Sequence, residues 1–153
     1  MKVLFVCLGN ICRSPAAEGV FLHLLQQKGL TDSFQVDSAG TSSIHNGERA
    51  DERMREHALK RGIELPSRAR QFVSKDFERF DHIVVMDDSN FENCKKLVMH
   101  VEDIGKIIKM AAFCPESGQS EVPDPYYGGA AGFEKVMDMV TEGAENLLKK
   151  WGY

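Results

Sequence analysis

Short apolar runs alternate along this chain with longer segments in which apolar residues recur at helical spacing. The runs at 2–6 and 82–86 are rich in Val, Ile and Phe and predict β-strands. Two weaker strand signals lie at 34–38 and 106–110. Because helical segments separate these four runs, we expect an α/β fold with a parallel sheet covered by helices on both faces.

The first helix is expected to follow the first strand closely. Ser14 is placed to be its N-cap residue, Pro15 suits the first helical position, and Gly29 supplies a stop. The apolar residues of this segment fall on one helix face, as expected for packing against a sheet: Ala17, Val20, Phe21, Leu24 and Leu25.

The rest of the chain predicts further helices and one long loop. Helices are expected over 51–61, in a short turn capped by Ser74, from Ser89 toward 99, and from about Gly132 onward. The last of these carries an apolar stripe that includes Trp151, which we assign to the core. The segment 114–125 holds three prolines and no periodicity, so we expect a loop there.

Composition narrows the class of protein. With 153 residues and no linker or repeat, residues 1–153 are expected to form a single domain. The formal net charge of −4 argues against a nucleic-acid partner. No apolar run is long enough for a signal peptide or a membrane span, so we expect a cytoplasmic protein without a membrane partner. The four cysteines match no zinc pattern, which predicts free thiols rather than a metal site.

The most informative segment is 7–15, which reads CLGNICRSP and joins the first strand to the first helix. A tight turn into a helix N-terminus points backbone N–H groups inward and forms an anion nest. Gly9 is expected to supply the unusual backbone angles. Arg13 can return across the turn and hold two phosphate oxygens with its planar fork. We therefore expect Cys7 to be an ionised nucleophile that attacks phosphorus, with Ser14 donating a hydrogen bond to its sulfur.

Ordinary structural explanations stand beside these roles. A lone Cys at a strand end is usually a small buried hydrophobe, but this leaves Arg13 and Ser14 at the same junction unexplained. Cys12 is either filler in the loop or a redox partner that protects Cys7 through a reversible disulfide. The chain has neither a G-x-x-x-x-G-K-[ST] motif nor a G-x-G-x-x-G motif after a strand, which argues against an NTPase or a dinucleotide-binding protein.

A second group of candidate residues lies in the long loop. Asp124 stands between two prolines and is a candidate proton donor for a leaving group. Tyr126 and Tyr127 could wall a substrate slot and stack on an aryl ring. The alternative is that Asp124 forms a turn and the tyrosines pack over it. Asp87, after the third strand, is a candidate second acid or hydrogen-bond support, or belongs to the N-cap region of the next helix.

With these motifs the chain resembles the low molecular weight protein tyrosine phosphatases. The matching segments are 6–15 with 17–18, 37–41, 69–71, 86–87 and 124–128, so the likeness covers the whole chain. The resemblance implies a three-layer α/β/α fold with a four-stranded parallel sheet and a phosphate-binding loop after the first strand. It also implies hydrolysis of phosphotyrosine in proteins and of small aryl phosphates, without a metal or organic cofactor.

The resemblance also implies a role for each residue of the motifs. Cys7 would be the nucleophile, Arg13 the phosphate clamp and Asp124 the general acid. Asn10, with a left-handed backbone, would join Ser14 and Ser38 in a polar network that braces the loop, and Asp87 would support it. Many relatives use the match of Cys12 as protective partner and are phosphorylated on the matching tyrosines. Inorganic phosphate and other oxyanions would inhibit. The residues expected to contact substrate are Leu8, Gly9, Asn10, Ile11, Cys12, Ser14, Ile44, Tyr126 and Tyr127.

Three positions bear on specificity and two other functions stay open. Ser67 stands where many relatives carry a His that completes the polar network, and Ile44 stands where eukaryotic relatives often place Trp. Ile11 matches the tyrosine phosphatases, whereas arginine phosphatases of the family usually have Thr there. Arsenate reduction would need further thiols, for which Cys94 and Cys114 are available. The remaining alternative is a phosphoprotein-binding module without catalysis.

Overall fold

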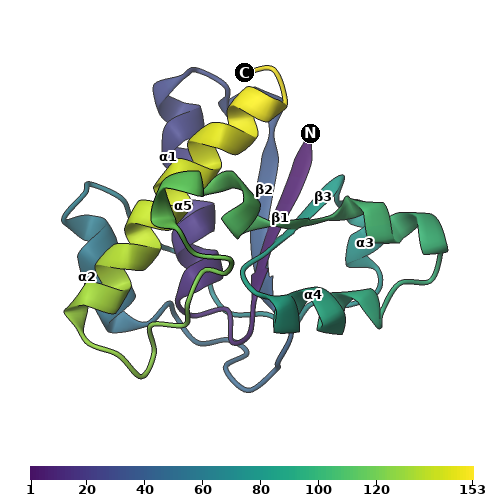
Figure 1. The fold of residues 1–153 in the computed structure, drawn as a ribbon, viewed down its shortest axis with the longest axis horizontal. Coiled ribbons are helices and arrows are strands. Elements are labelled where there is room, and N and C mark those ends of the chain that lie inside the picture. Colours follow the sequence, from purple (N-terminus) through teal and green to yellow (C-terminus); the bar gives the residue numbers. More distant parts are fainter.

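The computed structural model describes residues 1–153 and contains one parallel β-sheet. Its strands are β1 (Lys2–Cys7), β2 (Gln35–Gly40), β3 (His82–Val85) and β4 (Ile107–Lys109). They lie in the order β2-β1-β3-β4, and all three neighbouring pairs are parallel (Figure 1). The predicted four-stranded parallel sheet is therefore confirmed.

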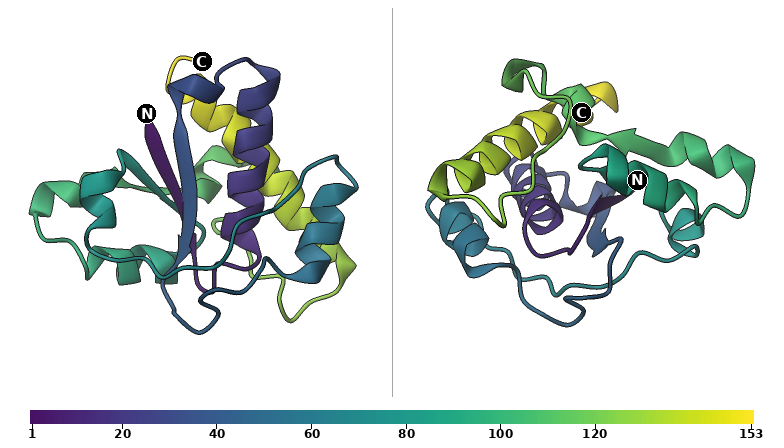
Figure 2. Two further views of the ribbon diagram at one scale, coloured as in Figure 1. Left: turned by 180° about the vertical axis from the view of Figure 1, so that it is seen from behind. Right: turned by 60° about the horizontal axis from the view of Figure 1, so that its bottom comes forward.

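Helices cover both faces of the sheet, which confirms the three-layer arrangement. The helices are α1 (Arg13–Gln27), α2 (Glu52–Leu59), α3 (Asp76–Arg79), α4 (Asp88–Lys95) and α5 (Ala130–Lys150). In Figures 1 and 2, α1, α2 and α5 lie together on one side of the sheet, and α3 and α4 lie on the other. None of these helices is both long enough and apolar enough to span a membrane.

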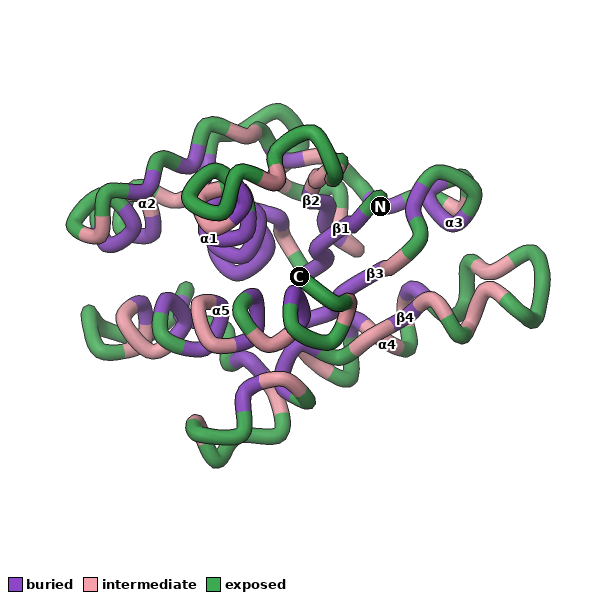
Figure 3. The backbone as a smooth tube through the Cα atoms, turned by 90° about the horizontal axis from the view of Figure 1, so that it is seen from above, coloured by how far each residue is buried: buried purple, intermediate pink, exposed green.

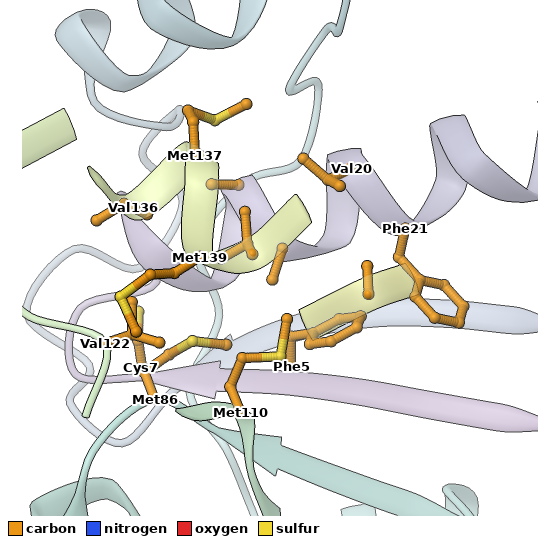
Figure 4. Packing of buried hydrophobic residues seen from close by; sticks show 14 of the residues in the cluster. Phe5, Cys7, Val20, Phe21, Met86, Met110, Val122, Val136, Met137 and Met139 are labelled. Atoms are coloured by element: carbon orange, nitrogen blue, oxygen red, sulfur yellow. The ribbon is translucent and has the colours of Figure 1, made fainter. Parts of the chain in front are cut away.

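Strand alternation divides the interior into two cores. Successive side chains of a strand point to opposite faces of the sheet. Phe5 and Cys7 therefore belong to a cluster of 30 buried residues under α1, α2 and α5, whereas Leu4 and Val6 belong to a cluster of 10 on the opposite face. The buried residues form a continuous centre in Figure 3, and Figure 4 shows how Cys7 extends the larger core to the end of β1.

Two predicted N-caps are wrong. α1 begins at Arg13, two residues earlier than expected, and Ser14 lies inside its first turn. The Ser14 hydroxyl cannot cap the helix because it bonds the Cys7 sulfur instead, at 3.0 Å. The second error concerns α3, which begins at Asp76 with no side-chain cap. There the Asp76 carboxylate, rather than the predicted Ser74, accepts the Val73 amide at 2.8 Å.

The apolar stripes of α1 and α5 pack against each other, but two of the residues predicted to belong to the core are only partly buried. Every predicted stripe residue of α5 is buried, but Trp151 follows the helix and is only partly buried. Its indole stacks on the His82 ring with 4.6 Å between centroids, so the predicted core position is in fact the rim of the core. Leu24 is likewise only partly buried.

The loops that follow β1, β2 and β3 meet at one edge of the sheet. Figure 1 shows this edge at the bottom, away from both chain termini. Gly40 pairs with Cys7 at this edge, and a Cβ on Gly40 would lie 2.7 Å from the Leu8 carbonyl oxygen. Only glycine permits this approach, so β2 ends against the turn that follows Cys7. The predicted long loop at 114–125 is confirmed apart from one short 3-10 turn, Pro115–Ser117.

Replacing Phe21 by Ala should lower the free energy of unfolding by about 3–5 kcal/mol, since a fully buried aromatic ring leaves a cavity. Phe21 is completely buried and packs against Phe5 and Phe34 with centroid distances of 5.6 Å and 5.5 Å. Urea denaturation followed by circular dichroism measures the change. The neighbouring Leu22→Ala, at a 38% exposed residue, is the control and should cost about 1 kcal/mol or less. Equal losses in both variants would contradict the packing described here.

Candidate active site

The turn between β1 and α1 has its carbonyl groups tied outward. The carbonyl oxygens of Cys7 and Leu8 accept the amides of Thr41 and Ser42, each at 2.9 Å. The carbonyl of Ile11 accepts the amide of Asp51 at 2.7 Å. These contacts come from the loop after β2 and from the start of α2, so two other segments of the chain fix the turn.

The amide groups of the same turn are free on its inner side. The N–H groups of Leu8, Gly9, Ile11 and Cys12 make no hydrogen bond within the chain, and that of Asn10 donates to the Cys7 sulfur at 3.3 Å. Successive unpaired amides around one point form a concave anion-binding site. The helix N-terminus of α1 adds a partial positive charge to the same place.

Asn10, and not Gly9, takes the left-handed backbone conformation of the turn. The φ angle of Asn10 is 56°, and no other residue except glycine has a positive φ, which confirms the expectation for Asn10. Gly9 has no positive φ, so its predicted role is wrong. A Cβ on Gly9 would lie 2.9 Å from the His45 ring, so a larger residue there would require the His45 side chain to shift.

Hydrogen bonds fix the direction in which Ser14 donates. The Asn10 side-chain oxygen accepts the Arg70 amide at 3.0 Å, which orients the Asn10 amide group. Its Nδ2 then donates to Ser14 Oγ at 2.7 Å and to Ser38 Oγ at 3.0 Å. Because Ser14 Oγ accepts from Asn10, its own hydrogen is available to Cys7 Sγ at 3.0 Å, which is nearer than the other acceptor, the Ala39 carbonyl at 3.4 Å. The sulfur is therefore placed to accept two hydrogen bonds.

The polar network ends on a buried carboxyl group that sequence reasoning missed. Ser38 donates to Glu18 Oε1 at 2.6 Å, and Glu18 is 9% exposed. Burial raises the pKa of Glu18, and its contacts with Ser38 and Ser67 oppose that rise. Ser67 thus faces Glu18 at the position where many relatives carry a His. Only the long-range pairing of α1 with β2 brings Glu18 to this network.

Arg13 is held by one edge of its guanidinium group. It is 3% exposed, and its Nη1 donates to Asp87 Oδ2 at 2.7 Å and to the Val122 carbonyl at 3.1 Å. Burial alone would lower the pKa of Arg13, but the charges of Cys7, Asp87 and Asp124 raise it above its usual value. Its Nε and Nη2 make no hydrogen bond within the chain, which leaves one edge of the fork for two oxygens of an anion.

Asp87 combines two of the roles considered for it. Its Oδ1 accepts the amide of Asn90 at 2.8 Å as the N-cap of α4, and Asn90 completes a capping box. Its Oδ2 holds Arg13. One carboxylate therefore joins the start of α4 to the arginine of the turn.

Asp124 faces Arg13 from the opposite loop. Its Oδ2 lies 3.7 Å from Arg13 Nη2, and its side chain is 37% exposed. Its Oδ1 accepts the Tyr126 amide at 3.0 Å, so the turn suggested by the sequence is present too. These contacts leave Asp124 at the pocket wall with one oxygen directed toward the anion site.

An open pocket of about 230 Å³ lies above the turn. It brings together most of the predicted site residues, whereas Asn10, Ser14, Ser38 and Asp87 lie behind its wall. Tyr127 is 93% exposed, so only the edge of its side chain can line the pocket. Two lining residues, Ser42 and His45, were missed, because they stand in a loop with no motif of their own. The lining residues are Cys7, Leu8, Gly9, Ile11, Cys12, Arg13, Ser42, Ile44, His45, Asp124, Tyr126 and Tyr127.

The start of α2 supports both loops of the pocket. Asp51 caps α2 and donates its amide to Ile11 in the turn. Arg53 Nη2 donates to the Tyr126 carbonyl at 3.1 Å, and its guanidinium lies 5.4 Å from the Tyr126 ring centroid. Neither residue was singled out from the sequence, because each acts through a contact between distant segments.

The other three cysteines differ from Cys7 in their surroundings. Burial, followed by the charge of Asp51, raises the pKa of the Cys12 thiol. Burial raises the pKa of Cys94 to about 12 and that of Cys114 to about 12. Cys94 and Cys114 belong to the two cores on opposite faces of the sheet, and neither lines the pocket. No disulfide is present, and no three His, Cys, Asp or Glu side chains are grouped as metal ligands.

Comparison with known proteins places this geometry in a family. Residues 2–152 match the family model described as low molecular weight phosphotyrosine protein phosphatase. A Synechocystis sp. protein whose name places it among the low molecular weight protein-tyrosine-phosphatases is 47% identical over 152 residues, covering 99% of this chain and 97% of the relative.

Two solved structures illustrate the likeness. The crystal structure of a protein tyrosine phosphatase from Entamoeba histolytica, with Hepes in its active site, has a TM-score of 0.95 at 47% identity, covering 99% of this chain and 96% of that one. The Drosophila arginine phosphatase has a TM-score of 0.93 at 31% identity, covering 100% of this chain and 99% of that one. The chain therefore belongs to the low molecular weight phosphotyrosine protein phosphatase family.

Proposed function

We propose that this chain hydrolyses phosphotyrosine in proteins, and small aryl phosphates, with Cys7 as nucleophile, Arg13 as phosphate clamp and Asp124 as general acid. The observation that carries the proposal is the position of the Cys7 sulfur beneath a turn whose amides are unpaired and beside the free edge of Arg13. An oxyanion held by those donors would have its phosphorus above the sulfur.

In the first step the thiolate attacks phosphorus in line, and the phosphorus–oxygen bond to the aryl group breaks as the sulfur–phosphorus bond forms. Asp124, in its protonated form, gives its proton to the departing phenolate oxygen. The turn amides and Arg13 hold the equatorial oxygens, on which negative charge accumulates. The products of this step are tyrosine and a phosphocysteine on Cys7.

In the second step water attacks the phosphocysteine, and the deprotonated Asp124 accepts a proton from that water. The sulfur leaves as a thiolate, which the hydrogen bond from Ser14 stabilises. Inorganic phosphate is released and is therefore an expected product inhibitor. Vanadate, which can become five-coordinate like phosphorus in the transition state, is expected to inhibit more strongly. The protein chemistry of both steps uses only side chains and amides of this chain.

The pocket walls support an aryl substrate. Leu8 and Tyr126 can contact the two faces of a ring, and Ile44 provides an aliphatic wall at the mouth. Phosphoarginine is a second candidate because the Drosophila arginine phosphatase shares this fold. Ile11 favours the aryl substrate, since an apolar side chain lines the pocket where arginine phosphatases usually have Thr.

The arrangement of thiols opposes arsenate reduction. A cysteine–arsenic adduct on Cys7 would have to be resolved by a further thiol near the pocket. Cys12 lines the pocket and could attack that adduct, but the Cys7–Cys12 disulfide formed in this way would need a third thiol to reduce it. Cys94 and Cys114 are buried in different cores, outside the pocket. Arsenate is therefore expected to act on this chain as an inhibitor.

The same proposal treats residues 1–153 as one domain and places the activity in the cytoplasm. The central sheet contributes residues to both cores, and this supports a single domain. A reducing compartment is supported by four unpaired cysteines, one of which must stay reduced for catalysis.

Cys7→Ser should lower the metal-free hydrolysis of para-nitrophenyl phosphate by about 10³-fold or more, because the hydroxyl is a far weaker nucleophile. Phosphate release is measured with a chelator present, beside Cys12→Ser as the control in the same loop. Vanadate binding by the Cys7→Ser protein would show that the anion site persists. Substantial turnover by this variant would remove Cys7 from the mechanism.

Asp124→Asn should lower kcat by about 10²-fold for phosphotyrosine, whose phenolate is a poor leaving group, and by much less for para-nitrophenyl phosphate. The reason is that protonation matters most when the departing oxygen is basic. Asp32→Asn, at an exposed position remote from the pocket lining, is the control. An equal loss for both leaving groups would mean that Asp124 serves only as a turn residue.

Iodoacetate at pH 7 should modify Cys7 at least about ten-fold faster than the other three cysteines, and phosphate should slow that reaction. The thiolate is the reactive form, and raised pKa values keep Cys12, Cys94 and Cys114 protonated at this pH. Mass spectrometry of peptides locates the label. Cys12 lines the same pocket, so equal labelling of Cys12 and Cys7 would contradict the assignment of a single activated thiol.

A further inference from the structure

A second pocket lies directly beside the catalytic one. It encloses about 450 Å³ between the loop after β2 and the C-terminal end of α4. The two pockets share Leu8 and Ser42, so these two residues form a ridge between them. The second pocket, called the flanking pocket here, is lined by Leu8, Thr41, Ser42, Gln71, Asn93, Lys96 and Leu97.

The ridge is fixed in place. The backbone N–H of Ser42 donates to the Leu8 carbonyl oxygen at 2.9 Å, and the backbone N–H of Thr41 donates to the Cys7 carbonyl oxygen at the same distance. These bonds continue the pairing of β1 with β2 beyond the ends of the strands. A substrate lying over the ridge would therefore meet a rigid edge, with its phosphorylated ring on one side and its neighbouring residues on the other.

The flanking pocket contains hydrogen-bonding groups that the chain does not use. The Asn93 side-chain amide makes no hydrogen bond within the chain, and Gln71 Nε2 donates to the Thr41 carbonyl while its Oε1 stays free. These side-chain groups are available to hydrogen-bond a bound peptide group.

Charge and apolar surface define what would bind there. Lys96 is the only charged residue that lines the flanking pocket, and it makes no salt bridge. Leu8 and Leu97 are 47% and 40% exposed and offer apolar contact on either side. A carboxylate on a short aliphatic stem suits a pocket with one unpaired ammonium group between apolar walls.

We propose that the flanking pocket is a subsite for a residue next to phosphotyrosine in a peptide substrate, and that it favours Asp or Glu there. The inference rests on the proposed phosphotyrosine hydrolysis and extends it to the sequence around the modified residue. Continuity with the catalytic pocket across the Leu8–Ser42 ridge supports a peptide as the occupant. A small aryl phosphate ends at the ridge and makes no use of the subsite.

The experiment compares phosphotyrosine peptides that carry Asp, Ala or Lys at each position within three residues of the phosphotyrosine. For each peptide, kcat/KM is divided by kcat/KM for para-nitrophenyl phosphate measured with the same protein. We expect an Asp preference of roughly five-fold over Ala at one or two positions on one side, as for a single exposed ion pair. The preference should shrink as salt is added.

Lys96→Glu should abolish this Asp preference and favour Lys at the same position. Lys95→Glu is the matched control, since it makes the same charge change on the neighbouring residue, which does not line the flanking pocket.

Three results would overturn the subsite: equal ratios for all peptides, an unchanged ranking in Lys96→Glu, or equal effects of Lys95→Glu and Lys96→Glu. Each of these would leave the turnover of para-nitrophenyl phosphate intact. Loss of that turnover in the unmodified protein would instead contradict the proposed function itself.

Discussion

The turn between β1 and α1 depends on hydrogen bonds that pull its carbonyl groups outward. Thr41, Ser42 and Asp51 take up those carbonyls, and the amides are left facing the Cys7 sulfur. An isolated chain would not keep several unpaired amides around a sulfur, because free amides are quickly satisfied by water or by the chain itself. The neighbouring segments impose the arrangement, and the pocket, the arginine position and the proposed chemistry all follow from it.

Charge around the anion site is balanced by elements from both sides of the sheet. Arg13 belongs to α1, whereas Asp87, which holds one edge of its guanidinium, caps α4 on the opposite face. The polar network behind the sulfur runs from Asn10 through Ser38 to Glu18. The side chains of Arg13, Asp87 and Cys7 are thus oriented at this end of the sheet in the absence of substrate.

The sequence motif between β1 and α1 predicted the parts of the site that the motif itself contains. Prediction failed for residues whose role depends on contacts with distant segments of the chain. The strand, the turn and the helix around Cys7 were all predicted from a few adjacent residues. The hydrogen bond between Ser14 and the Cys7 sulfur was predicted, but Ser14 was also wrongly taken as the cap of α1. Gly9 was credited with the backbone angle that Asn10 adopts. Glu18 and Arg53 were missed, since each acts only through contacts that folding brings together.

Asp51 and Arg53, at the start of α2, each form a hydrogen bond to one of the two loops that line the pocket. One contacts the turn that holds the nucleophile, and the other contacts the loop that carries Asp124, although these loops are more than 100 residues apart in the chain. A displacement of α2 would therefore act on both loops. Cys7 itself belongs to β1, so the sheet holds the sulfur in place, while α2 links the loop of Asp124 to the turn that surrounds it.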